Sequence, residues 1–125
     1  MKPTSPSQKL RWWYNKANKE AFQGKLPKIF VGYKRLEDGG THAAETHSQT
    51  RIDYSRGRKG RKTLVATEIR VNPRFRDCEQ ISLCILMHEI VHVGELTAQR
   101  ETKCRTKAFS KKVAALILKL APEVL

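Results

Sequence analysis

The feature that most constrains this chain is an H-E-x-x-H sequence at residues 88–92, which follows an apolar run. The run, residues 81–87, contains neither glycine nor proline and, together with the motif, is long enough to form a buried helix. On a helix, residues four apart lie one above the other, so His88 and His92 would point to the same side. Two imidazoles at this spacing can share one metal ion. Zinc accepts such nitrogens, together with a third protein ligand and a water.

Glu89 is offset by one residue from the two histidines, where it could take a proton from a metal-bound water. The alternative is a buried helix whose histidines form hydrogen bonds within the core. Two histidines and a glutamate would be costly in an apolar segment without a partner, which favours the metal. We therefore predict a Zn²⁺ site with His88 and His92 as ligands and Glu89 as the catalytic residue.

The charge of the chain indicates a polyanionic partner. Lys and Arg number 25 against 12 Asp and Glu, which gives a net charge of +13. Such a surface favours nucleic acid through counterion release, although a lysine-rich surface can also serve solubility alone. Cations concentrate in residues 55–62, which we expect to contact phosphates, the alternative being a solvated hairpin tip. The cations concerned are Arg56, Arg58, Lys59, Arg61 and Lys62.

The first half of the chain predicts a helix and two strands. Residues 1–7 are expected to be a loose lead-in, with Ser5 or Ser7 capping a helix that ends near Phe22. Trp12 and Trp13 cannot share one helical face, so Trp12 should lie at the surface, where it is either simply exposed or stacked on a base. The strands are predicted at residues 28–33 and 42–54. The second is polar and could pair with an extended peptide.

The second half predicts one further strand and two helices. The strand covers residues 64–72, ahead of Pro73. Asp77 is the expected N-cap of the H-E-x-x-H helix, and Gly94 is its expected end. The last helix should begin at Thr97 or Thr102 and run to residue 120.

Length and composition indicate one intracellular domain. A chain of 125 residues with 39% hydrophobic content suffices for a single core, and we expect it to be a monomer. The three cysteines are an odd number without C-x-x-C spacing, which argues against a disulfide framework. No apolar run is long enough to cross a membrane, and the N-terminus lacks the apolar core of a signal peptide.

The order of these features resembles the SprT-like metalloprotease domain, the family that includes the Spartan DNA–protein crosslink proteases. The resemblance spans about residues 10–117. It rests on the F-x-G-x-L-P segment at residues 22–27, the I-x-V-N-P segment at residues 69–73 and the H-E-x-x-H motif. It implies a single zincin-like α+β domain over residues 1–125. Such a domain would have an N-terminal helix, a small, mostly antiparallel three-stranded sheet, the H-E-x-x-H helix and a C-terminal helix. The resemblance also implies cleavage of proteins near DNA.

The third zinc ligand departs from the family pattern. In the family it is a histidine four residues before an aromatic residue, here matched by Phe109, and that position holds Arg105. A guanidinium cannot bind zinc at neutral pH. Glu101 is the replacement we favour, because two histidines and a glutamate form a known catalytic zinc set. Cys104, Glu95, or His42 or His47 from the strand region are the alternatives, as is the absence of a third protein ligand.

The function predicted from the sequence is a zinc metallopeptidase of SprT-like type that acts on proteins associated with DNA. Arg105 supports a second hypothesis, a nucleic-acid-binding module on a scaffold that has lost catalysis. A third hypothesis is a protein-interaction domain whose basic face meets an acidic partner. Zinc content separates the first hypothesis from the second, and a preference for nucleic acid separates the second from the third.

Overall fold

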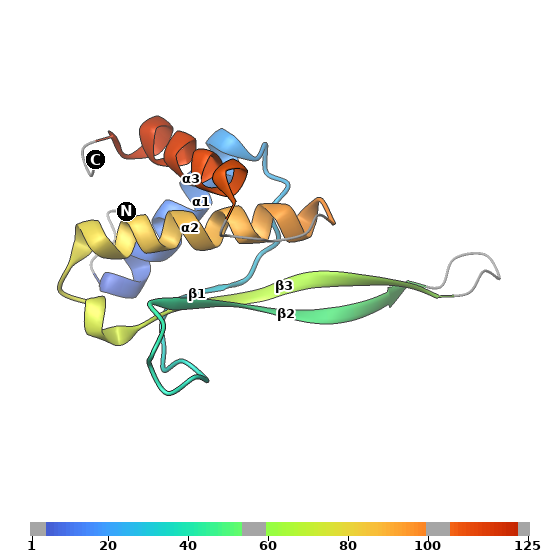
Figure 1. Ribbon diagram of the computed structural model, residues 1–125, viewed down its shortest axis with the longest axis horizontal. Coiled ribbons are helices and arrows are strands. Elements are labelled where there is room, and N and C mark those ends of the chain that lie inside the picture. The colour runs from blue at the N-terminus through green and yellow to red at the C-terminus, as the bar shows by residue number, and fades with distance from the viewer. Residues whose placement is uncertain (1–4, 54–59, 100–105, 123–125) are drawn as a thin grey trace.

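A computed structural model describes residues 5–53, 60–99 and 106–122 (Figure 1). It contains α-helices, β-strands and one short 3-10 helix, η1. In chain order these are α1 (Pro6–Ala21), β1 (Phe30–Tyr33), β2 (Ala44–Asp53), β3 (Arg61–Val71), η1 (Pro73–Phe75), α2 (Glu79–Thr97) and α3 (Lys107–Leu120). The predicted α+β class is therefore confirmed.

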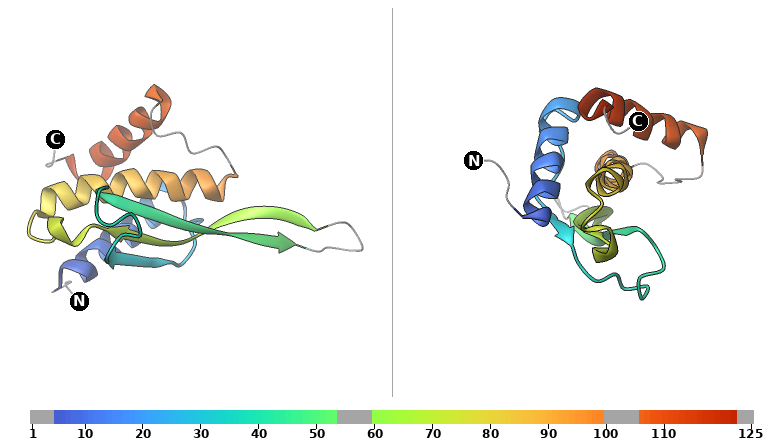
Figure 2. Two further views of the ribbon diagram at one scale, coloured as in Figure 1. Left: turned by 60° about the horizontal axis from the view of Figure 1, so that its bottom comes forward. Right: turned by 90° about the vertical axis from the view of Figure 1, so that its left-hand side faces the viewer.

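Helix α2 lies at the centre of the molecule, with the sheet on one side and the other two helices packed around it (Figure 2). Its buried residues are apolar over most of the circumference, because the sheet, α1 and α3 cover different sides of it. Leu86, Met87 and Ile90 are fully buried. The helix that carries the H-E-x-x-H motif is thus held from several directions and is a rigid base for those side chains.

The sheet has three strands, as predicted, and is mixed, with one antiparallel and one parallel pairing. Its order is β1-β3-β2, with β1 parallel and β2 antiparallel to β3. The segment between β1 and β2 crosses the end of β3, which places the two strands on opposite sides of it. Asn72 fixes this crossing, since its side-chain amide donates hydrogen bonds to the carbonyls of Gly40 and His42, at 3.2 and 3.1 Å. The asparagine of the I-x-V-N-P segment is therefore structural.

Helix α1 begins after Ser5, the first of the two predicted caps. Ser5 accepts a hydrogen bond from the Gln8 amide, and the Gln8 side chain accepts one from the Ser5 amide, which is a capping box. Pro6 occupies the first turn, where its missing N–H costs nothing. Residues 6–7 are therefore helical rather than part of a loose lead-in, and residues 1–4 lie outside the described part. The apolar face of the helix packs into the core, with Leu10, Tyr14 and Ala17 buried.

Both ends of α2 differ from the prediction. Cys78, and not Asp77, is the N-cap, and no side chain caps the helix there. Gly94 does not end the helix, which continues to Thr97. A Cβ at Gly94 would lie 2.6 Å from the Phe22 ring, so the glycine serves the close approach of α1 rather than a C-terminal stop. No helix of the described ranges is both long and apolar enough to cross a membrane.

Helix α3 begins at Lys107, later than either predicted start. Thr106 caps it by accepting a hydrogen bond from the amide of Phe109. Thr97 ends α2 instead of starting α3, and Thr102 lies outside the described residues. Its buried side chains are Phe109, Leu116, Ile117 and Leu120.

Candidate metal centre

His88 and His92 lie on successive turns of α2 and face the same side. Their ring centroids are 4.9 Å apart. The ring of Phe109, at the start of α3, packs on both, with centroid distances of 4.9 Å to His88 and 4.5 Å to His92. Both histidines are partly exposed. The first turn of α3 therefore stands directly beside the imidazole pair.

Burial keeps both imidazoles neutral. It lowers the pKa of His88 below its ordinary value. Burial and, to a smaller extent, the neighbouring His88 lower the pKa of His92 to about 4, against an opposing effect of Glu95. A neutral imidazole has a free ring nitrogen, which is the form that binds zinc. The pair is therefore in the protonation state that a metal site needs.

Glu89 is almost completely buried, with 7% of its surface exposed. The hydroxyl of Thr46, in β2, donates a hydrogen bond of 2.5 Å to its carboxylate. Burial raises the pKa of Glu89, and the Thr46 hydrogen bond opposes that rise. Within the described residues β2 pairs only with β3, so its outer edge is unpaired next to this carboxylate. A candidate general base thus lies between a histidine pair and an edge strand.

The described residues contain two candidate ligands, His88 and His92, but not a third. Over the ranges 5–53, 60–99 and 106–122, no three His, Cys, Asp or Glu side chains are grouped closely enough to hold a metal. Glu95 is buried one turn beyond His92, but its carboxylate forms an ion pair with Lys112 of α3. Glu101, Cys104 and Arg105 lie outside the described residues.

The strand histidines are directed to other partners. His42 forms a close ion pair with Asp38 in the segment before β2. His47 follows Thr46 along the strand and so points to the opposite face, where its Nε2 lies 3.0 Å from Glu45. The structure therefore does not bring either of them to the α2 histidines.

The donor chemistry of the pair fits zinc. Two neutral imidazoles side by side, with a buried carboxylate one residue from the first, are the parts of a catalytic zinc site that the described residues contain. In the described part of the chain no buried polar side-chain atom lacks a hydrogen-bond partner. A third ligand would have to come from residues outside the described ranges. Residues 100–105 are such residues, and in the sequence they directly precede Thr106, the N-cap of α3.

The predicted basic segment is only partly described. Arg61 and Lys62 belong to β3, opposite Asp53 and Ile52 of β2, and so lie in a strand rather than a loop. Arg56, Arg58 and Lys59 fall outside the described residues. The β2–β3 hairpin extends past the end of α2 (Figure 1), which places its far end away from the helices.

Sequence reasoning missed Thr46. It lies 43 positions before Glu89, and only the packing of β2 beneath α2 brings the two together. The alternation of the strand could have assigned Thr46 to one face but not to this carboxylate.

Comparisons of the chain with protein-family models, curated proteins and solved structures found no match.

Proposed function

We propose that this protein is a zinc-dependent metallopeptidase of SprT-like type, with a zincin-like fold, that acts on proteins associated with DNA. The observation that carries the proposal is the position of Glu89. Its buried carboxylate is held by Thr46 of an edge strand, beside two neutral histidines. A structural helix has no need for this combination, whereas hydrolysis of a peptide needs each part of it.

Each part has a role in the proposed reaction. His88 and His92 would hold zinc, which when bound would polarise the scissile carbonyl and activate water. Glu89 would accept the proton of that water and pass it to the leaving amine. The unpaired edge of β2 would bind the substrate as an added strand, and main-chain hydrogen bonds would align the peptide beside Glu89.

The association with DNA rests on charge and on the family resemblance. A net charge of +13 attracts phosphates strongly enough to concentrate the enzyme on nucleic acid. Arg56, Arg58, Lys59, Arg61 and Lys62 are proposed to contact the backbone. The enzyme is proposed to act as an intracellular monomer on proteins bound or crosslinked to DNA.

The direct test compares Glu89→Gln with the parent in cleavage of a DNA-bound protein. The amide cannot accept a proton, so we expect activity to fall at least about 100-fold. Glu20→Gln, an exposed glutamate of α1, removes the same charge elsewhere and should leave activity unchanged. Equal rates for Glu89→Gln and the parent would refute the mechanism.

The third ligand is proposed to be Glu101, with Cys104 and Glu95 as alternatives. Zinc content of the purified parent should be near one ion per chain. It should fall in Glu101→Ala, or in Cys104→Ser if the thiolate is the ligand instead. Glu95→Gln tests the remaining alternative, and we expect it to keep its zinc, because Lys112 already pairs with that carboxylate. Glu20→Gln is the matched control. Loss of zinc only in Glu95→Gln would identify Glu95 as the third ligand.

A second function is favoured by Arg105, which stands at the ligand position of the family pattern. In this alternative the fold binds nucleic acid without catalysis. It predicts a parent protein that holds no zinc even when the metal is added, with nucleic-acid binding intact.

A further inference from the structure

The two tryptophans of the chain meet on α1, where Trp12 is exposed and Trp13 is half-buried against the core. Trp12 has 43% of its surface exposed, which is unusual for so large an apolar side chain. Its ring meets Trp13 edge to face at a centroid distance of 4.9 Å. The ammonium of Lys16 lies over both rings, at 5.2 and 5.1 Å from their centroids. An aromatic surface with a fixed cation is therefore presented to solvent.

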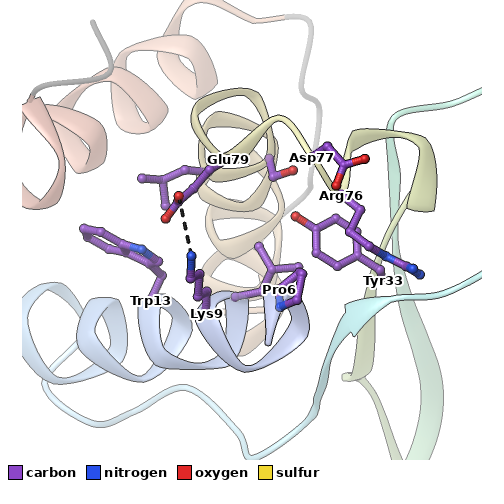
Figure 3. A pocket seen from close by; sticks show the side chains of 10 residues that line it. Pro6, Lys9, Trp13, Tyr33, Arg76, Asp77 and Glu79 are labelled. Carbon is purple, nitrogen blue, oxygen red and sulfur yellow. Dashed lines mark ion pairs between the residues drawn. The ribbon is translucent and has the colours of Figure 1, made fainter. Parts of the chain in front are cut away.

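A cavity of about 220 Å³ adjoins this surface, between α1 and the start of α2. Figure 3 shows Trp13 on one side of it and Tyr33 of β1 on the other. Arg76 stands over the Tyr33 ring at 6.0 Å, and Lys9 reaches into the cavity from α1. The cavity thus has an aromatic ring at each end, and cations within reach of both.

Aromatic rings beside cations match the two parts of a nucleotide, its base and its phosphate. Bases stack on aromatic rings, and phosphates bind the adjacent cations. In a duplex the faces of the bases are covered by their neighbours, so stacking requires a single strand. We propose that single-stranded nucleic acid binds here, on a surface that we name the α1 platform. It consists of Lys9, Trp12, Trp13 and Lys16 with Tyr33 and Arg76 across the cavity.

Charge decides between a single strand and other partners. The described side chains around the platform include Lys9, Lys16 and Arg76, and the chain as a whole carries +13. An acidic peptide would satisfy the cations but would leave the rings without stacking partners. Two carboxylates, Asp77 and Glu79, also line the cavity, and Glu79 is the partner of Lys9 there.

An ion pair spans the cavity in the unbound protein. Lys9 Nζ lies 3.7 Å from Glu79, as the dashed line in Figure 3 marks, and both side chains are largely exposed. Exposed pairs of this kind are weak, so a phosphate can replace Glu79 as the partner of Lys9.

The proposal rests on the proposed function only for its link to proteolysis. Binding to the platform needs neither zinc nor cleavage, so the two can fail separately.

The first experiment is a titration of intrinsic tryptophan fluorescence. Since Trp12 and Trp13 are the only tryptophans, the emission reports on the platform alone. An oligonucleotide of about 16 deoxycytidines should quench the emission as bases stack on the rings. A duplex of the same length and inorganic polyphosphate should bind with much less quenching. Equal quenching by polyphosphate, or stronger quenching by the duplex, would overturn the proposal.

Variants then locate the contact. Trp12→Leu should weaken binding of the single strand by about 5- to 100-fold, and Lys16→Gln should weaken it less. Lys111→Gln, an exposed lysine of α3, is the control for lost charge and should change it least. Circular dichroism checks that each variant is folded. A Trp12→Leu variant that is folded and binds like the parent would overturn the proposal.

Glu79→Gln gives a test in the opposite direction. It removes the carboxylate that competes for Lys9, so binding should tighten, by up to about fivefold. Glu20→Gln also removes one negative charge, but in the last turn of α1, and it should have a smaller effect. Weaker binding by Glu79→Gln than by Glu20→Gln would contradict the role of Lys9.

Discussion

At the scale of single residues, Thr46 is the clearest positioning group of the candidate site. Its hydroxyl is the hydrogen-bond donor that holds Glu89 between the edge strand and the histidines. Thr46→Val keeps the shape of the side chain but leaves a buried carboxylate without that donor. A hydrogen bond to a charged group contributes about 1.5–3 kcal/mol, so we expect kcat to fall by roughly 10- to 100-fold.

Thr46→Ser is the matched control, since it restores a hydroxyl at the same place. It should recover most of the activity of the parent, whereas a merely structural role of the methyl group predicts no recovery. Thermal unfolding of both variants separates loss of the fold from misplacement of Glu89.

Tyr14 makes stability depend on pH in the alkaline range. Its hydroxyl donates a hydrogen bond of 2.6 Å to the carbonyl of Pro27, and burial raises its pKa to about 12. The unfolded chain, with a tyrosine pKa of about 10, loses this proton first. Between pH 10 and 12 the folded state therefore holds more protons, and the free energy of unfolding falls by at most about 1.4 kcal/mol per pH unit.

Urea unfolding at several pH values between 9 and 12 measures this contribution. Tyr14→Phe should be less stable at pH 9, because it lacks the hydrogen bond, but should lose less stability as the pH rises. Tyr33→Phe retains Tyr14 and should follow the slope of the parent. Identical slopes for Tyr14→Phe and the parent would contradict the assignment.

At the scale of elements, Gly94 shows how α1 packs on α2. A Cβ there would lie 2.6 Å from the Phe22 ring. Gly94→Ala gains about 1 kcal/mol of helix propensity, but the overlap costs about 1–3 kcal/mol. We therefore expect a net loss of stability. In a Phe22→Leu background the overlap is relieved, and the same change should become neutral or stabilising. A double-mutant cycle by urea unfolding measures this coupling, and a stabilising Gly94→Ala in the parent would contradict the packing.

The sequence predicted the elements better than their arrangement. Periodicity located α1 and the core of α2, because the apolar spacing of a helix is a local property. The parallel pairing of β1 with β3 depends on where the intervening segment crosses, which Asn72 fixes through contacts with Gly40 and His42. Gly94 was predicted to end α2. Its steric role instead depends on Phe22, a residue distant in sequence, and so could not be predicted from the local pattern.

In the candidate site, too, the sequence predicted the residues of one element but not the contacts made by other elements. His88, Glu89 and His92 share one helix, so their spacing determines their mutual positions. Thr46 and Phe109 reach them from other elements, and contacts of that kind leave no local signal in the sequence. The third ligand belongs to the same class, since only tertiary packing decides which distant side chain reaches the histidine pair.

At the scale of the whole molecule, the candidate metal centre and the proposed nucleic-acid contacts lie on different elements. The histidine pair and Glu89 lie at the centre of α2, while the proposed nucleic-acid contacts lie on the β2–β3 hairpin and on α1. A strand of nucleic acid held at the periphery would keep an attached protein near the edge of β2. In the proposed arrangement, binding to nucleic acid would concentrate the substrate and would not take part in the chemistry.

The salt dependence of binding tests whether those contacts are local. Each phosphate contact of a single strand contributes about −0.7 to the slope of log K against log salt concentration. Replacing Arg56, Arg58 and Lys59 with glutamine should therefore make the slope shallower by about 2. Replacing Lys107, Lys111 and Lys119 of α3 with glutamine lowers the net charge equally. It should leave the slope nearly unchanged, because those lysines are not proposed to touch phosphates. Equal changes in both triple variants would mean that overall charge, and not a defined surface, attracts the nucleic acid.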